Sequence, residues 1–325
     1  GSIFVLAISS WYLLKKRDLG FARRSFAIAS AFGLAAILSV IVLGDESGYA
    51  LGDVQQTKLA AIEGEWHTEQ APAAFTLVGL PNMETQSTDY AVKIPYAMGI
   101  IATRSLDEEV TGLQDLMAQH EVRIRNGIVA YERLKTLRAG DRSAENIALF
   151  DEVKHDLGYG LLLQKYTEDI TQATEEQIKL ATADTIPHVP SLFWSFRVMV
   201  GAGFLMLVLF VLAFWASTKH RQEHKPWLLK FALFSLPLPW IGVQTGWYVA
   251  EMGRQPWSIA EVLPTFLSVS SLSVSDVLAS IITISAIYLV LIIIEMYLMI
   301  RFARIGPSTL GTGRYHFEQN NTNNL

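Results

Sequence analysis

The chain has 325 residues, of which 51% are hydrophobic and only 18% are charged, and its mean hydropathy is positive. This composition indicates a membrane protein with a sizeable polar part. The net charge of −5 argues against a nucleic-acid partner, and the absence of cysteine excludes disulfides, thiolate metal sites and cysteine nucleophiles.

The first apolar stretch, at residues 3–14, is too short to cross a bilayer. As a helix it would rise about 18 Å, whereas a hydrocarbon core is about 30 Å thick. A Lys-Lys-Arg run follows it at 15–17, and it lacks the leading positive charges of a signal peptide. We therefore expect residues 1–17 to be the end of a truncated transmembrane helix, in a chain that is either a fragment of a longer protein or a cleaved one.

Four further apolar runs are long enough to span a bilayer. They lie at residues 25–43, 198–217, 231–249 and 277–294. The polar residues at 44–46 predict the end of the first span. Pro237 and Pro239 predict a kink in the third span, and Ser275 with Asp276 predicts an N-cap for the fourth.

The distribution of Lys and Arg predicts how the spans are oriented. Basic residues cluster before the first span, between the second and third, and after the fourth, whereas the connection 252–276 carries only Arg254. Because cytoplasmic connections are enriched in Lys and Arg, the clusters should be cytoplasmic. The long polar segment then lies on the outer face, which is the periplasmic face of the inner membrane of a double-membraned bacterium.

The predicted fold is an all-α integral membrane protein with four full transmembrane helices, the end of a fifth, and a large, mostly helical periplasmic loop. Its segments are the truncated helix at 1–17, transmembrane helices at 24–44, 193–218, 227–250 and 276–300, the periplasmic loop at 45–192, a periplasmic connection at 251–275 and a cytoplasmic tail at 301–325.

Inside the loop, helical signals alternate with less regular sequence. The segment 105–108 has the pattern of a capping box and predicts a helix that continues to about Leu134. A second helix is predicted at 147–157 and a short third one after a cap at 174–177. Between residues 49 and 103 the pattern is mixed and rich in proline, which predicts an irregular, packed segment.

Trp247, Glu251 and Arg254 form the first candidate site, at the outer end of the third span. Their spacings of four and three residues would place them on one face if the helix continues. An aromatic ring, an anion and a cation on one stripe could hold a flat, anionic cofactor, and ionisable groups at such a position are usually functional. An interfacial aromatic belt with a surface ion pair explains the same residues.

Arg197 and Met199 form a second candidate at the outer end of the second span. A methionine thioether can be an axial ligand of haem iron, although a methionine in an apolar helix is more often packing. Arg197 could snorkel to the membrane edge or pair with a haem propionate. The predicted topology places this pair near the first candidate, so an anionic cofactor could lie beneath the loop.

Lys58 and Glu63, in the loop, are candidates for acid–base chemistry. They are five residues apart, so their side chains would diverge on a helix. They could still bind and deprotonate a hydroxyl-bearing substrate, or they could lie on a solvated helix face. Glu295, near the inner end of the last span, could be a proton-path group or a snorkelling end residue.

Taken together, these stretches resemble subunit I of the bacterial cytochrome bd quinol oxidases, in the type with a long quinol loop. The KLAAIE and GRQPW segments carry the resemblance most specifically. Similar stretches cover essentially the whole chain, at 42–49, 52–66, 94–105, 123–127, 156–163, 196–199, 237–257, 261–265 and 313–319.

The resemblance implies roles for the candidate residues. Lys58 and Glu63 match the quinol-oxidation residues of the family. Met199 matches an axial ligand of the low-spin haem b, and Arg197 its neighbouring basic residue. Glu251 matches an axial ligand in the site of the high-spin haem b and haem d. Trp247 matches the aromatic residue between the haems, and Arg254 matches a propionate partner.

The reaction that the resemblance implies is quinol oxidation at the periplasmic face and reduction of oxygen to water with cytoplasmic protons, which separates charge without a pump. The implied partners are subunit II, small single-span subunits, and the preceding half of subunit I, which carries histidine ligands that no histidine of this chain matches. A transporter or sensor with an outer ligand-binding domain and no haem is the alternative.

Overall fold

The computed structural model describes residues 1–71, 73–98, 105, 107 and 109–305, and the chain forms two compact units, 1–268 and 269–325. Among the described residues, four helices are long and apolar enough to cross a membrane. They contain the four predicted spans, so the prediction of an all-α, multi-pass membrane protein is confirmed. The prediction for the tail beyond residue 305 lies outside the described residues.

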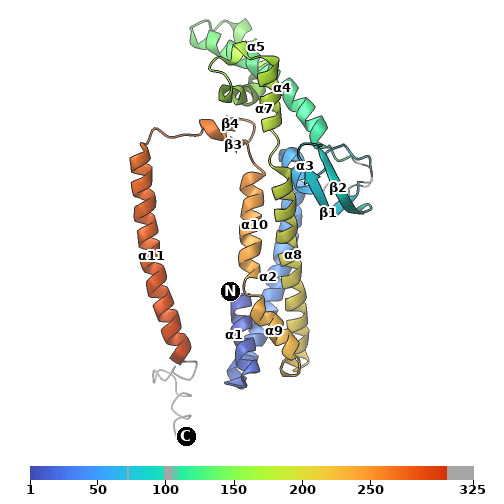
Figure 1. The fold of residues 1–325 in the computed structure, drawn as a ribbon, viewed down its shortest axis with the longest axis vertical. Helices are drawn as coiled ribbons and strands as arrows, with labels where there is room; N and C mark the ends of the chain where they lie inside the picture. The colour runs from blue at the N-terminus through green and yellow to red at the C-terminus, as the bar shows by residue number, and fades with distance from the viewer. Residues whose placement is uncertain (72, 99–104, 106, 108, 306–325) are drawn as a thin grey trace. The chain divides into compact units, whose positions relative to one another are not determined.

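The first unit is built on a bundle of apolar helices (Figure 1). Its helices are α1 (Ser2–Leu14), α2 (Leu19–Val54), α8 (Val189–Thr218), α9 (Pro226–Phe234) and α10 (Leu238–Met252). Leu6, Phe26, Leu209 and Leu228 are completely buried where α1, α2, α8 and α9 meet. Gly33 lies directly against the Phe210 ring, so a side chain at this position would collide with the α2–α8 contact.

Two of these helices differ from the predicted boundaries. The prediction that α2 ends at residues 44–46 is wrong, because the helix continues to Val54. A run of acidic residues ends an apolar span but does not break the hydrogen bonding of the helix, and the Ser47 hydroxyl donates to the Leu43 carbonyl within it. The kink expected at Pro237 and Pro239 is a complete break between α9 and α10.

The loop between α2 and α8 is mostly helical, as predicted. It contains α3 (Gln56–Glu63), strands β1 (Phe75–Asn82) and β2 (Ser87–Ile94), and helices α4 (Leu113–Arg138), α5 (Ala144–Val153), α6 (Leu157–Leu161) and α7 (Glu175–Asp184). The predicted cap of α7 is confirmed, since Thr174 and Gln177 form a capping box.

The β1–β2 hairpin was not predicted. Its strands pair antiparallel from Phe75 with Ile94 to Asn82 with Ser87, with irregular register in between. The irregular register explains the weak signal, because a shift of one residue moves side chains to the other face and disrupts the apolar–polar alternation. In place of an irregular segment, the loop therefore has a regular element beside α8.

The start of α4 also differs from the prediction. The expected capping box at 105–108 does not begin the helix, which starts at Leu113 after Gly112; Leu106 and Glu108 lie outside the described residues. The backbone before α4 instead bonds to the segment that follows α3. Val110 pairs with Glu69, and the Gly112 N–H donates to Thr68 Oγ1.

A close helix crossing fixes α6 against α4. Gly127 on α4 and Gly160 on α6 lie so near each other that a Cβ on either would meet the backbone of the other helix. The two glycines therefore allow contact that any larger residue would prevent. Two turns before Gly127, His120 lies beside Tyr159, with ring centroids 5.2 Å apart.

After α10 the chain forms a short antiparallel pair, β3 (Trp257–Ile259) and β4 (Leu263–Pro264). The second unit contains α11 (Val274–Ile305), the most apolar of the candidate spans. The prediction that Ser275 or Asp276 caps α11 is wrong. The helix starts at Val274. The Ser273 hydroxyl accepts from the Asp276 N–H at 3.3 Å and donates to Asp276 Oδ2 at 2.6 Å.

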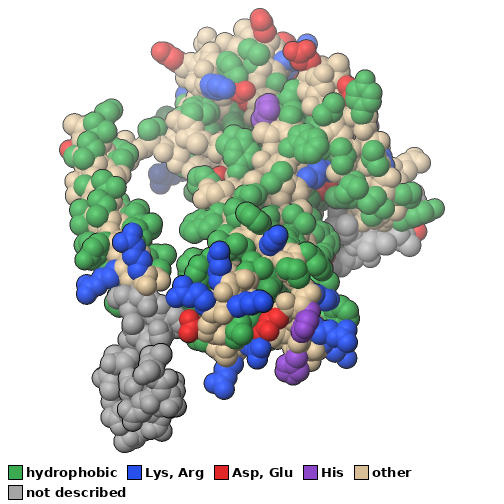
Figure 2. Space-filling view, turned by 60° about the horizontal axis from the view of Figure 1, so that its bottom comes forward, with side chains coloured by type: hydrophobic (Ala, Val, Ile, Leu, Met, Phe, Trp, Pro, Cys, Tyr) green, Lys and Arg blue, Asp and Glu red, His purple; other side chains and the backbone are tan. Residues whose placement is uncertain are grey.

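Lys and Arg side chains gather at one end of the first unit, where α1 meets α2 and where α8 meets α9 (Figure 2). The opposite end of the bundle continues into the loop (Figure 1). Arg23 and Glu223 form an ion pair across the basic end.

Candidate functional site

Helix α3 lies at the junction between the bundle and the loop, and it carries both Lys58 and Glu63. The side chains of these two residues are buried, although α3 is only two turns long. Gly64 ends the helix with φ +66°, a conformation that favours glycine. Its carbonyl accepts from Thr88 Oγ1 at 2.6 Å, which ties the end of α3 to β2.

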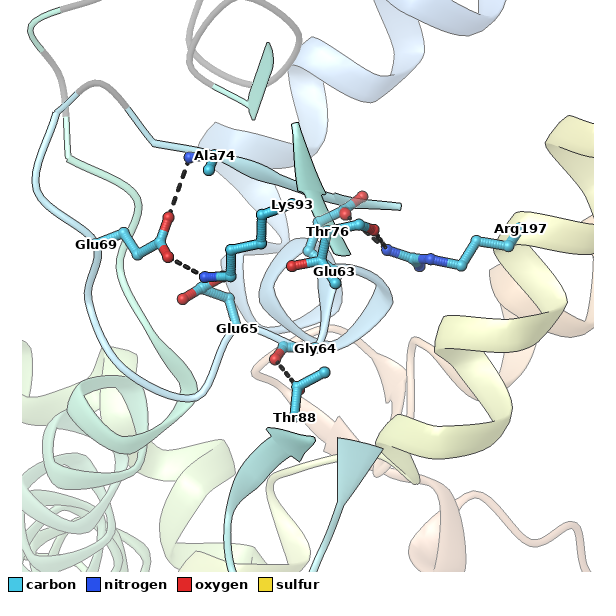
Figure 3. Close-up of polar contacts among 9 residues, drawn as sticks. All are labelled: Glu63, Gly64, Glu65, Glu69, Ala74, Thr76, Thr88, Lys93 and Arg197. Carbon is cyan, nitrogen blue, oxygen red and sulfur yellow. Dashed lines mark hydrogen bonds and ion pairs between the residues drawn. The ribbon is translucent and has the colours of Figure 1, made fainter. Parts of the chain in front are cut away.

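Glu63 is part of a closed network centred on Arg197 of α8 (Figure 3). Arg197 Nη2 lies 3.2 Å from Glu63 Oε2, and Nη1 donates to the carbonyl of Ile62 at 2.7 Å. The remaining N–H groups donate to the carbonyls of Phe193, Thr76 and Leu77. An arginine has five N–H donors, so every donor of Arg197 is occupied.

The burial of Glu63 sets its protonation. Removal from water favours the neutral acid and raises the pKa of Glu63 to about 7, although the charge and hydrogen bond of Arg197 act in the opposite direction. Glu63 can therefore gain or lose a proton near neutral pH, which an ordinary carboxylate cannot do.

A second carboxylate, the partly buried Glu65, lies beside this network and was missed in the sequence. Burial raises its pKa to about 7 as well, and Lys93 of β2 opposes that shift from 3.8 Å. Lys93 also pairs with Glu69, which accepts from the Ala74 N–H (Figure 3). The spacing of the two carboxylates was visible in the sequence, but Lys93 joins Glu65 to Glu69 only through the unpredicted hairpin.

Lys58 faces different surroundings, a pocket of about 210 Å³ between the loop and the segment after α10. The Lys58 side chain packs against Gly253, where an added Cβ would lie 2.8 Å from Lys58 Cγ. Burial lowers the pKa of Lys58, and the nearby Arg254 lowers it further. The pocket also contacts Gln55, His120, Arg123, Tyr159 and Glu261.

The far wall of the pocket is a set of polar side chains brought together from separate elements. His120 Nδ1 lies 2.9 Å from Thr185 Oγ1. Arg123 lies over the Tyr159 ring, 4.1 Å from its centroid, and pairs with Asp156 at 2.7 Å and with Glu261 at 2.9 Å. None of these residues was predicted as part of a site, because no short spacing links them.

Two atoms among the pocket-lining side chains lack a partner. The side-chain amide oxygen of Gln55, Oε1, and Arg254 Nε are both buried without a hydrogen bond to any described residue. A buried polar group without a partner costs free energy, so such atoms indicate where a ligand or water binds. The lining residues of the pocket thus include one unpaired acceptor atom and one unpaired donor atom.

The structure brings Glu251 and Arg254 together as predicted, since they form an ion pair at the end of α10. Trp247 precedes them by one turn and is 65% exposed, on a stripe with Trp240 and Val243. Met199 lies against the same helix, with Sδ 2.9 Å from the position a Cβ would take at Gly246. Arg197, in contrast, extends away to Glu63.

Comparison of the sequence with known proteins identifies the family of this chain. The sequence model of the family described as cytochrome bd terminal oxidase subunit I matches residues 1–307. The chain belongs to this family. It is 43% identical over 310 residues to the cytochrome bd-II ubiquinol oxidase subunit 1 of Escherichia coli (strain K12), which covers 95% of the chain and 60% of that protein.

A more distant relative supports the same family. The cytochrome bd ubiquinol oxidase subunit 1 of Bacillus subtilis (strain 168) is 27% identical over 307 residues, which are 94% of the chain and 54% of that protein. The chain thus spans a little over half the length of these cytochrome bd subunits. The predicted family is confirmed, and with it a membrane oxidase family that uses haem and quinol.

Proposed function

We propose that this chain is the quinol-oxidising, haem-binding part of a respiratory oxidase that passes electrons from quinol to oxygen and forms water. The observation that carries the proposal is the link between Glu63 and Arg197. It joins a buried carboxylate that exchanges protons near neutral pH to the helix position two residues before Met199. Proton release and electron transfer would thereby begin at one junction.

The charge distribution supports a periplasmic position for this junction. The basic end of the bundle in Figure 2 is opposite to the loop, and basic ends face the cytoplasm of the inner membrane. We infer that 45–192 and 251–275 are periplasmic, that the C-terminal tail is cytoplasmic, and that residues 1–17 are the end of a transmembrane helix.

The residues present fit haem in part. Met199 would supply a thioether, which can ligate haem iron, and Glu251 would supply a carboxylate. Arg254 has a buried Nε without a partner, which suits a propionate. Trp247 offers an exposed ring beside Glu251. Arg197 does not fit as a propionate partner in this arrangement, because all five of its donors are occupied.

We infer that Met199 would hold the low-spin haem b, and that Glu251, Trp247 and Arg254 would serve the high-spin haem b and haem d. When bound, the haems supply one-electron transfer and oxygen chemistry. The histidine ligands and the cytoplasmic proton path would belong to the preceding half of subunit I, and subunit II with small single-span subunits would complete the complex.

Residues of this chain would have separate roles in quinol oxidation. Lys58, buried in the pocket, would donate to an oxygen of the head group and hold it there. Glu63, on the other side of α3, would receive a proton and pass it outward. Arg197 keeps the Glu63 carboxylate partly ionised, because its charge opposes the effect of burial.

The experiment that tests this function is a reduced-minus-oxidised optical spectrum of the assembled membrane complex, with quinol-dependent oxygen uptake measured on the same sample. Haem b and haem d bands together with uptake are expected. A transporter or sensor would show neither, and the same outcome on a full-length chain would overturn the proposal.

Substitution of Lys58 tests the pocket directly. We expect Lys58→Met to lower quinol-dependent oxygen uptake roughly tenfold or more, because a hydrogen bond from a charged group is lost. Lys165→Met is the matched control, since Lys165 pairs with Asp184 at the surface of the loop. An equal loss in both variants, or none in Lys58→Met, would contradict the assignment.

A further inference from the structure

We propose that His120 is a hydrogen-bond acceptor for the quinol head group, and that its bond to Thr185 makes the Lys58 pocket selective for quinol over quinone. This inference rests on the proposed function. It concerns a residue on a different element, 62 positions beyond Lys58 in the chain, and it assigns that residue a single tautomer.

The tautomer follows from a chain of hydrogen bonds. Thr185 Oγ1 donates to the Thr182 carbonyl at 2.7 Å, and a carbonyl can only accept. The single hydroxyl proton of Thr185 is therefore used, so Thr185 Oγ1 must accept from His120 Nδ1, 2.9 Å away. A proton on Nδ1 of a neutral imidazole leaves Nε2 with a free lone pair.

The lone pair is available to the pocket. His120 is 7% exposed and lines the pocket, and Nε2 forms no hydrogen bond with any described residue. Nε2 is also not among the fully buried side-chain atoms that lack a partner, so part of its surface is accessible.

The charges around His120 keep it neutral. The ionisable groups that line the pocket are Lys58, Arg123, Arg254, Tyr159 and Glu261. Burial lowers the pKa of His120 to about 4, and Arg123 lowers it while Glu261 opposes. At neutral pH the imidazole thus carries no second proton, and Nε2 remains an acceptor.

An acceptor distinguishes the two redox forms of the substrate. A quinol carries two hydroxyl donors, whereas a quinone has only carbonyl acceptors. The cavity of about 210 Å³ is below the roughly 300–1,000 Å³ of pockets for drug-sized ligands, so it suits a single substituted ring. One hydroxyl would donate to His120 Nε2, while Lys58 donates to the oxygen across the ring.

The test uses the assembled oxidase and compares KM for a short-chain quinol with the inhibition constant of the matching quinone. We expect His120→Leu to raise KM for quinol roughly 2- to 12-fold, the range of one net hydrogen bond, with little change in quinone inhibition. His155→Leu is the matched control, because His155 is exposed and lies outside the pocket.

Thr185→Val gives a sharper readout, because it preserves His120 but removes the group that fixes the tautomer. Nε2 can then carry the proton and become a donor, so KM for quinol should rise while quinone inhibits more strongly. Optical haem content, measured on each variant, shows that the complex is assembled.

Three results would separate the ideas. A wild-type complex that oxidises no quinol would overturn the proposed function itself. A wild type that oxidises quinol, with assembled His120→Leu and Thr185→Val variants that resemble it, would overturn the role of His120 alone. Equal weakening of quinol and quinone in both variants would also overturn it, since that result indicates lost packing without selectivity.

Discussion

Glu63 and Lys58, five residues apart on α3, have opposite kinds of surroundings. At Glu63 the network is closed, because Arg197 uses all of its donors on the carboxylate and on backbone carbonyls. Lys58 instead lines a cavity of about 210 Å³, and the lining residues Gln55 and Arg254 each keep an unpaired buried atom. A closed network holds elements together and sets a proton equilibrium, whereas an open one leaves polar atoms for a ligand.

Removal of Arg197 should have the largest effect on stability of all the changes considered for these two sites. Arg197→Leu leaves the buried Glu63 carboxylate and four carbonyls without their donor. We expect a loss of about 3–5 kcal/mol in the free energy of unfolding, as for other buried pairs that lose one partner. Thermal unfolding of the purified complex, together with its assembled yield, measures the effect.

Arg125→Leu is the matched control for that experiment. Arg125 pairs with Glu121 and Glu175, but its side chain is 42% exposed, so the loss should stay below about 1 kcal/mol. If the two leucine variants were equally stable, the Arg197 network would contribute no more than a surface ion pair.

A smaller loss of stability is expected at the crossing of α4 and α6, which supports one wall of the Lys58 pocket. Gly127→Ala would place a methyl group against the backbone at Gly160 and Asp156, which cannot move as a flexible side chain can. Overpacking of this kind costs about 1–3 kcal/mol, and separation of α6 from α4 would also move Tyr159 and weaken quinol binding.

Gly201→Ala is the corresponding control on α8, since no atom lies within 4 Å of a Cβ at Gly201. It should unfold at the wild-type temperature or slightly above, because alanine favours a helix more than glycine does. A Gly127→Ala variant with wild-type stability and wild-type KM for quinol would show that the helix crossing does not shape the pocket.

How far the sequence predicts this molecule depends on the range of the interaction. The spans were predictable, because each is one continuous apolar run such as 198–217 within α8. The divergence of Lys58 and Glu63 was predictable too, since five residues are well off one helical face. The pair Glu251 and Arg254 needed only a local spacing of three.

The rest depends on contacts that leave no local pattern. Arg197 bonds mostly to backbone carbonyls, which any sequence would supply, so only the fold shows that it is unavailable to a propionate. His120 and Thr185 are 65 residues apart and meet through the packing of α4 against α7. The hairpin that brings Lys93 to Glu65 was hidden by its irregular register.

The smallest expected effect concerns the proton equilibrium of the closed network. Because burial raises the pKa of Glu63 to about 7, the carboxylate is mostly ionised at pH 8 and mostly protonated at pH 6. Only the ionised form can accept a proton, so quinol oxidation by the wild type should fall as pH falls, by about tenfold from pH 8 to pH 6. Glu63→Gln should be slow and nearly independent of pH in this range.

Glu65→Gln separates Glu63 from its neighbour. Burial raises the pKa of Glu65 to about 7 as well, so either acid alone could produce the pH profile. Glu65 faces Lys93 of the hairpin, whereas Glu63 faces the helix that carries Met199. If Glu63 is the acceptor, Glu65→Gln keeps the wild-type profile. A profile that persists in Glu63→Gln and disappears in Glu65→Gln would move the proton acceptor to the hairpin side of the junction.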